Sequence, residues 1–141
     1  MLDPATYPGG LLGPDTTVLR PFANAAAPDG QDGDLYIREA DFAKVFAADV
    51  AAEQSLLMCL EQRPLSLSAF GGTAAADPAW KTLPCWALVA EEDNAIPPAG
   101  QHWMAGRAGA TVDTVASSHA VMVSHPEAVT TTVLAAVDSL A

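Results

Sequence analysis

Basic residues are scarce in this sequence. It contains six Lys and Arg residues against 17 Asp and Glu residues, which gives a formal net charge of −11 at pH 7. Binding to nucleic acid needs clustered Lys and Arg side chains, and an anionic membrane surface attracts the same residues. We therefore expect no nucleic-acid partner and no membrane partner. The acidic surface itself favours solubility and identifies no partner.

Long apolar runs and motif-spaced cysteines are absent as well. No run approaches the roughly 20 apolar residues of a membrane span, and MLDPATYPGG lacks the basic start and apolar stretch of a secretory signal. We therefore expect a cytoplasmic protein, provided that no segment precedes Met1. Cys59 and Cys85 lie in apolar surroundings and are expected to be free thiols. The three histidines do not follow a metal-binding pattern, so we expect no metal and no cofactor.

Apolar residues are plentiful, at 50% of the 141 residues, which is enough for one domain with a core. The composition changes near residue 77, and we expect a first region at 1–76 and a second at 77–141. The first region is rich in turn-forming residues. It has candidate strands at Val18–Phe22 and Asp34–Ile37, which pair across their connection, and candidate helices at Glu39–Ala48 and Ala51–Gln62.

The second region has a clear alternation of elements. CWALVA (85–90) is a continuous apolar run, typical of a strand buried on both faces of a parallel sheet. A helix is expected to begin at Pro97 and Pro98 and to run to about Ala108 with Gly109 as its stop, and ATVDTVA (110–116) is the next strand. A closing helix begins at Pro126, and its expected inner face consists of Val129, Val133, Ala136, Val137 and Leu140. This order predicts a parallel strand pair with helices.

Two chemically active side chains follow these two strands. Asp93 comes just after the first strand, and His119 just after the second. The carboxyl ends of the strands are the edge where open α/β sheets place their chemistry. In a Ser-His-Asp triad the histidine takes the proton of the nucleophile, while the acid holds the histidine in the correct tautomer. Asp93 and His119 therefore fit the roles of triad acid and triad base.

The stretch CWALVAEEDNAIPPAGQHWMAGRAGATVDTVASSHAVMVSHPEAV resembles the C-terminal end of an α/β-hydrolase. Within that superfamily it is most similar to the bacterial branch related to plant methylesterases and hydroxynitrile lyases. The resemblance covers residues 80–138 well, and residues 16–70 are more loosely similar to the cap of the family. It implies an α/β fold consisting of the cap region plus the last two parallel strands with their helices, and therefore an incomplete sheet. It also implies Asp93 as the acid and His119 as the base, with Glu92 as the second choice for the acid.

The nucleophile of this family stands in a G-x-S-x-G turn between a strand and a helix, and the sequence contains no such motif. Ser55 and Cys59 fall within a predicted helix, and Ser66 and Ser68 have no flanking glycines. The early strands are absent too, and with them the oxyanion hole, which uses the amide after the nucleophile and one from an early loop. We therefore expect the chain to be partial or truncated and to be inactive on its own.

Three functional interpretations remain open. The first is a partial carboxylic-ester hydrolase acting on a small ester-like molecule, with lyase chemistry as a variant of the same triad. The second is a non-catalytic remnant that binds an apolar ligand or a partner, and the third is one half of a split hydrolase. An exposed sheet edge predicts self-association or pairing with a missing N-terminal half.

Overall fold

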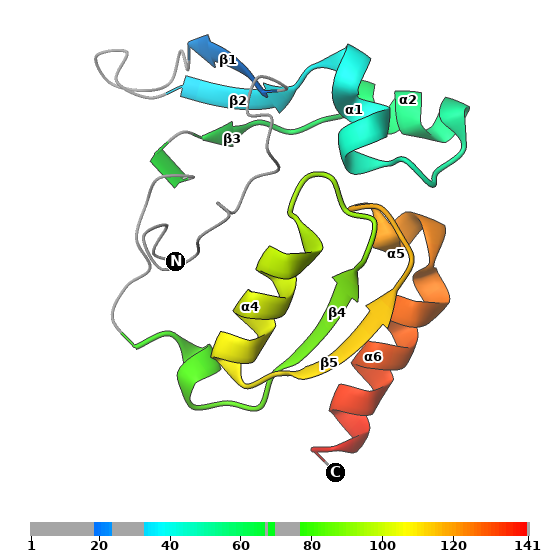
Figure 1. Cartoon of the computed structure of the whole chain (residues 1–141). Coiled ribbons are helices and arrows are strands. Elements are labelled where there is room, and N and C mark those ends of the chain that lie inside the picture. The colour runs from blue at the N-terminus through cyan, green and yellow to red at the C-terminus, as the bar shows by residue number, and fades with distance from the viewer. Residues whose placement is uncertain (1–18, 24–32, 67, 70–76, 141) are drawn as a thin grey trace.

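A computed structural model describes residues 19–23, 33–66, 68–69 and 77–140 of the chain (Figure 1). The predicted strand start at Val18 lies outside the described residues. The described elements form two sheets with helices, and the second sheet is parallel, as the predicted α/β class requires. None of the helices in these ranges has the length and apolarity that crossing a bilayer demands.

The first sheet is antiparallel and has the strand order β1-β2-β3. Strand β1 (Leu19–Ala23) pairs with β2 (Gly33–Ile37), with Leu19 opposite Ile37 and Ala23 opposite Gly33. This confirms the predicted pairing. The third strand, β3 (Leu65–Ser66), was not predicted, because two residues are too few to show an alternating pattern.

Two short helices follow β2. Helix α1 (Glu39–Phe46) buries Phe42, and helix α2 (Ala52–Leu60) buries Ser55 and Cys59. Both helices are shorter than predicted. Helix α1 ends where Ala47 leaves the helical region, with φ at −138° and ψ at 46°.

The second sheet consists of β4 (Trp86–Ala90) and β5 (Thr111–Val115), which run parallel with Trp86 opposite Thr111 and Ala90 opposite Val115. A short 3₁₀ helix, η3 (Ala79–Lys81), precedes β4. Helix α4 (Pro98–Ala108) connects the two strands and ends at Gly109, whose φ of 62° is left-handed, as the predicted stop requires.

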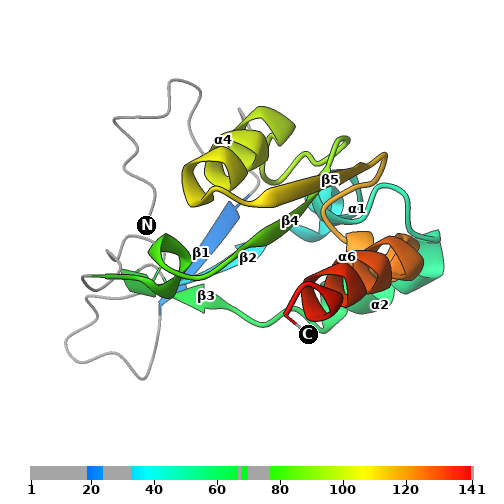
Figure 2. The same cartoon turned by 90° about the horizontal axis from the view of Figure 1, so that it is seen from below.

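The chain finishes with α5 (Val121–Ser124) and α6 (Pro126–Asp138). Helix α5 was not predicted, because a single turn has no measurable period. Figure 2 shows α4 on one side of the β4–β5 pair and α6 on the other, so helices cover both faces of the small sheet.

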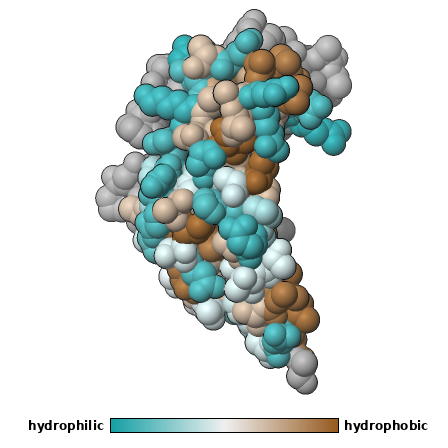
Figure 3. Space-filling model, turned by 90° about the vertical axis from the view of Figure 1, so that its right-hand side faces the viewer, coloured by the Kyte–Doolittle hydropathy of each residue, from teal (hydrophilic) through white to brown (hydrophobic). Residues whose placement is uncertain are grey.

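Two expectations about burial were wrong in part. Only Val89 and Ala90 of β4 are buried, and residues 86–88 are half-buried, because β4 has one strand neighbour among the described strands. Of the inner-face residues predicted for the closing helix, Val133 and Val137 of α6 are 55% and 56% exposed, and Leu140, which follows the end of α6, is 71% exposed. The half-buried face of α6 consists of Ala128, Val129, Thr132 and Ala136. Val129 and Ala136 of this face were predicted. Figure 3 shows hydrophobic surface gathered near the end of α6.

A small core joins the two regions of the chain. Phe42, Ala47, Cys59 and Ala120 are buried together, and Ile37, Phe46, Val50, Met58 and Val123 pack against them. Ala120 belongs to the turn that follows β5, whereas the other three buried residues belong to α1, α2 and the loop between them. The turn after β5 is therefore packed against the α1–α2 helices.

Candidate active site

Asp93 lies in the turn after β4, and its carboxylate is almost completely enclosed. Its side chain is 2% exposed. The Oδ1 atom accepts hydrogen bonds from the backbone N–H groups of Ala95 and Ile96, at 2.7 Å and 3.0 Å. This local pattern, in which an Asp side chain accepts from the backbone two and three residues ahead, is typical of a turn. The turn itself therefore orients the carboxylate.

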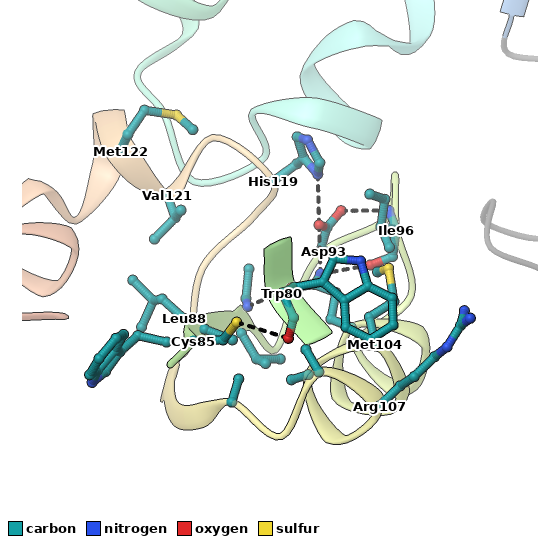
Figure 4. A pocket seen from close by; sticks show the side chains of 18 residues that line it. Trp80, Cys85, Leu88, Asp93, Ile96, Met104, Arg107, His119, Val121 and Met122 are labelled. Atoms are coloured by element: carbon teal, nitrogen blue, oxygen red, sulfur yellow. Dashed lines mark hydrogen bonds and ion pairs between the residues drawn. The ribbon is translucent and has the colours of Figure 1, made fainter. Parts of the chain in front are cut away.

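The second carboxylate oxygen of Asp93 meets His119. Their Nδ1 and Oδ2 atoms lie 2.7 Å apart, although the two residues are 26 positions apart in sequence. Figure 4 shows the imidazole of His119 and the carboxylate of Asp93 pointing toward one another. The contact arises because β4 and β5 are parallel neighbours, so the turns after them meet at one edge. Since a carboxylate only accepts, Nδ1 carries the proton and Nε2 is left for proton transfer.

Gln101 completes the surroundings of Asp93, and sequence reasoning missed it. Its Nε2 group donates to Asp93 Oδ2 and to the carbonyl of Ile96, each at 2.8 Å. Its Oε1 atom accepts from the backbone N–H of Ala90 at 3.1 Å. Gln101 thus ties α4 to the end of β4 and to the acid. The sequence signal for this contact was the position of Gln101, in the first turn of a predicted helix and eight residues after Asp93.

The other acidic and histidine candidates lie elsewhere. Glu92, the second choice for the acid, is exposed, and its described contact is a backbone bond from its N–H to the carbonyl of Ser117. His102 lies on the exposed side of α4, with its Nε2 atom 2.8 Å from Glu91 Oε1. His125 is partly buried, with its Nε2 atom 3.7 Å from Asp49 Oδ2. Asp93 is therefore the acid that the structure brings to His119.

The contacts that the structure describes for the serines and cysteines considered as nucleophiles do not join any of them to His119. Ser55 is 2% exposed, and its hydroxyl has no hydrogen-bond partner within the described ranges. Cys59 is buried in the same helix, and desolvation raises the pKa of its thiol, which disfavours the reactive thiolate. The hydroxyls of Ser66 and Ser68 lie 2.7 Å from one another on the surface. Cys59 and Cys85 are both free thiols, as predicted.

A pocket of about 830 Å³ adjoins the Asp93–His119 pair. It extends along β4 and α4, and its walls are mainly apolar (Figure 4). Its larger apolar side chains include Trp80, Trp86, Leu88, Ile96, Met104 and Met122, and its polar lining includes Gln101 and Arg107 besides Asp93 and His119. An apolar pocket with a few polar groups at one end is the usual form of a small-molecule site.

Comparison with known proteins places this arrangement in a family. The profile of a family described as "Alpha/beta hydrolase family" matches residues 1–132. Two solved structures are similar in fold. Polyneuridine aldehyde esterase has a TM-score of 0.63 and 20% identity, over 79% of this chain and 44% of that chain. A mutant of the same esterase has a TM-score of 0.62 and 19% identity, with the same coverage.

The chain therefore spans less than half the length of these two structures. A comparison with curated proteins found no significant match. The family profile nevertheless covers most of the sequence, including the turns that carry Asp93 and His119. The chain belongs to the alpha/beta hydrolase family, and its parallel strand pair with flanking helices is a part of that fold.

Proposed function

We propose that this chain supplies the acid and the base of an esterase-type serine hydrolase. The observation that carries the proposal is the 2.7 Å contact between His119 Nδ1 and Asp93 Oδ2 at the edge of the parallel strands. Three further N–H groups, from Ala95, Ile96 and Gln101, hold the Asp93 carboxylate in place. A histidine held in one tautomer by an oriented acid is the arrangement that activates a hydroxyl nucleophile.

The reaction follows from the roles of the two ring nitrogens. His119 Nε2 accepts the proton of a serine hydroxyl as the serine oxygen attacks the carbonyl carbon of an ester. The protonated imidazole, stabilised by Asp93, then gives this proton to the departing alcohol oxygen, which leaves an acyl-serine. Water attacks the acyl-serine and transfers a proton to Nε2, and this proton returns to the serine oxygen as the carboxylic acid is released.

We propose that the serine comes from polypeptide outside these 141 residues, because the sequence contains no G-x-S-x-G motif. The second edge of β4 pairs with no other described strand, and the apolar pocket runs along this strand. A parallel strand with one free edge offers backbone groups for a further strand. Nucleophile-bearing polypeptide that pairs with β4 would stand beside Asp93 and His119, either as another part of the same protein or as a separate chain.

The proposed substrate is a small ester with an apolar group. The pocket beside the acid–base pair is lined mainly by aromatic and aliphatic side chains, which suit an apolar acyl or alcohol group. The similar solved structures are of an esterase by name, which supports ester hydrolysis over the lyase variant of the same triad.

The test is turnover of simple aryl esters by the longest polypeptide that the reading frame containing this sequence encodes. We expect a G-x-S-x-G motif upstream and measurable hydrolysis, which His119→Ala lowers by on the order of 10³-fold or more. His102→Ala is the matched control, because His102 also contacts a carboxylate but lies on the exposed side of α4. An upstream region closed by stop codons, with no co-purifying polypeptide that carries such a motif, would contradict the proposal. So would hydrolysis that survives His119→Ala.

A further inference from the structure

The turn that carries His119 is attached to a carboxylate from the other region of the chain. Asp49 lies in the loop between α1 and α2, and its Oδ1 atom accepts a short hydrogen bond from the hydroxyl of Ser118, 69 positions away in sequence. Ser118 is 1% exposed. Its hydroxyl also lies 3.2 Å from the carbonyl oxygen of Phe46. Because a hydroxyl has one proton, the charged carboxylate is its stronger acceptor.

The residue on the other side of His119 is attached to the same segment. The backbone N–H of Ala120 donates to the carbonyl of Phe46 at 2.9 Å. The rings of Phe46 and His119 lie against one another, with their centroids 4.7 Å apart. Both neighbours of His119 are therefore bonded to residues 46–49, and the imidazole itself packs on this segment.

The hydrogen bonds at Asp49 favour its charged form. Burial by itself raises the pKa of this carboxyl group, but hydrogen bonds from the hydroxyls of Ser118, Ser124 and Ser117 hold it well below its usual range. The hydroxyls of Ser117 and Ser124 lie 3.1 Å from each other. Of the three serines, Ser118 makes the hydrogen bond to Asp49 that carries the attachment, whereas the hydroxyl of Ser117 donates to the carbonyl of Ser118 at 3.0 Å.

We propose that Asp49 is a positioning residue for His119, acting through Ser118. The inference rests on the proposed function, in which His119 is the base. Asp49 does not contact the imidazole. It fixes the backbone on the N-terminal side of His119, so that Nδ1 stays within 2.7 Å of Asp93 Oδ2. Without this attachment the turn keeps the Ala120–Phe46 hydrogen bond but loses its hold on the N-terminal side of His119, so Nδ1 moves more freely relative to Asp93 Oδ2.

The readout is the tautomer of His119 in the 141-residue chain, labelled with ¹⁵N at histidine. The ¹⁵N chemical shifts of an imidazole distinguish the Nδ1–H form from the Nε2–H form. Solid-state spectra give them for sedimented as well as dissolved protein, so self-association of the chain does not prevent the measurement. A side chain with only a structural role in folding would lower stability without changing the tautomer ratio of the folded protein.

We expect Asp49→Ala to lower the ratio of the Nδ1–H to the Nε2–H form by roughly fivefold, the effect of losing one partly buried hydrogen bond. Ser118→Ala removes the same link from the other side and is expected to lower the ratio equally. Asp41→Ala is the matched control, because the carboxylate of Asp41 on α1 accepts from Arg38 Nε at 2.7 Å on the surface. This variant is expected to keep the wild-type ratio.

Three results would overturn the proposal: an unchanged ratio in Asp49→Ala, an unchanged ratio in Ser118→Ala, or an equal fall in Asp41→Ala. If Asp49→Ala does not fold, Ser118→Ala decides the matter alone, since it removes a single oxygen atom. The tautomer ratio needs no turnover. If the ester assay fails but the Nδ1–H to Nε2–H ratio falls in Asp49→Ala, the positioning role of Asp49 holds and the proposed esterase function does not.

Discussion

Four N–H groups surround the carboxylate of Asp93, two on each oxygen. A carboxylate has about four acceptor positions, so these donors leave almost no capacity for solvent. Three of the donors belong to the turn after β4 and to α4, and only one belongs to His119. The carboxylate of Asp93 is therefore oriented mainly by groups other than His119, namely the turn after β4 and Gln101.

Gln101→Ala is predicted to weaken this orientation. The change leaves the N–H of Ala90 and the carbonyl of Ile96 without their present partners, and each such loss in a buried place costs about 1–3 kcal/mol. We expect a fall of that order in the free energy of unfolding, measured with urea. Gln54→Ala, at an exposed position of α2, is the control and should change stability by less than about 0.5 kcal/mol. An equal loss in both variants would contradict the role given to Gln101.

Asp49 makes stability depend on pH at the acid end. Its pKa is lowered in the folded chain, so its contribution is fully present above the pKa of the unfolded chain and is lost as the pH falls through the folded pKa. We expect Asp49→Asn to be less stable than the parent at neutral pH, with the difference shrinking only below the usual range of aspartate. Both the parent and Asp49→Asn should also carry His125→Gln. The Nε2 atom of His125 lies 3.7 Å from Asp49 Oδ2, and this change removes the titration of His125 from the comparison. A difference independent of pH down to the acid limit would contradict this account.

The proximity of Asp93 and His119 could be predicted from the sequence, whereas the residues that support them could not. Asp93 and His119 each follow a recognisable strand, and parallel neighbouring strands bring their ends together. Asp49 has no such signal, because it reaches Ser118 only after the loop between α1 and α2 folds onto the turn after β5. Gln101 carried a weak signal through its position in α4. Contacts between distant segments depend on packing that a local pattern does not record.

At the scale of elements, α4 shows which boundaries the sequence determines. Its start follows from two prolines and its end from Gly109, and the observed bounds Pro98–Ala108 agree with the prediction. The face of α6 was predicted less well. Apolar residues surround much of this helix, so the periodicity alone did not distinguish the half-buried Val129 from the exposed Val133 and Val137.

Two glycines of the α4 region are predicted to respond in opposite directions to alanine. Gly109 has a φ of 62°, which an L side chain adopts at a cost of about 1 kcal/mol, so Gly109→Ala should lower stability. Gly106 lies within α4, and a Cβ there would meet nothing within 4 Å. Gly106→Ala should therefore raise stability by about 0.5–1 kcal/mol. Thermal unfolding measures both. The same sign for the two variants would show that α4 does not end at Gly109.

At the scale of the whole molecule, the described part of the chain leaves much apolar surface uncovered. Val133, Leu134 and Val137 of α6 and Leu140 just after it are each more than half exposed, and the pocket along β4 is mainly apolar. Monomeric proteins seldom expose so much contiguous apolar surface, and a strand edge adds unpaired backbone groups. These features agree with a structure that matches 44% of the similar esterase chain.

The 141-residue chain on its own is therefore predicted to self-associate. Val137→Glu should reduce the association, because it places a charge among the exposed apolar residues of α6. Thr131→Glu adds the same charge at another exposed position of α6 and should have less effect. Light scattering after size-exclusion chromatography gives the mass. A monodisperse monomer with a sharp thermal transition would contradict the prediction.

The α/β class, the parallel pair and the family were predictable at this scale because the second region has strong local signals. The short β3 and α5 were not, since elements of two and four residues carry no period. The attachment of the α1–α2 loop to the turn after β5 could not be predicted from the sequence either. It depends on the core formed by Phe42, Ala47, Cys59 and Ala120, which joins segments far apart in sequence.

The most direct measurement of the central claim is the rate at which a fluorophosphonate probe labels serine in the complete polypeptide or in the pair of chains. A serine reacts rapidly with such a probe when an adjacent base accepts its proton, which is the role proposed for His119. We predict a label on a serine outside these 141 residues, at a rate greatly reduced by His119→Ala and by Asp93→Asn and unchanged by His102→Ala. A label on a serine within this chain, or a rate that His119→Ala leaves unchanged, would contradict the account.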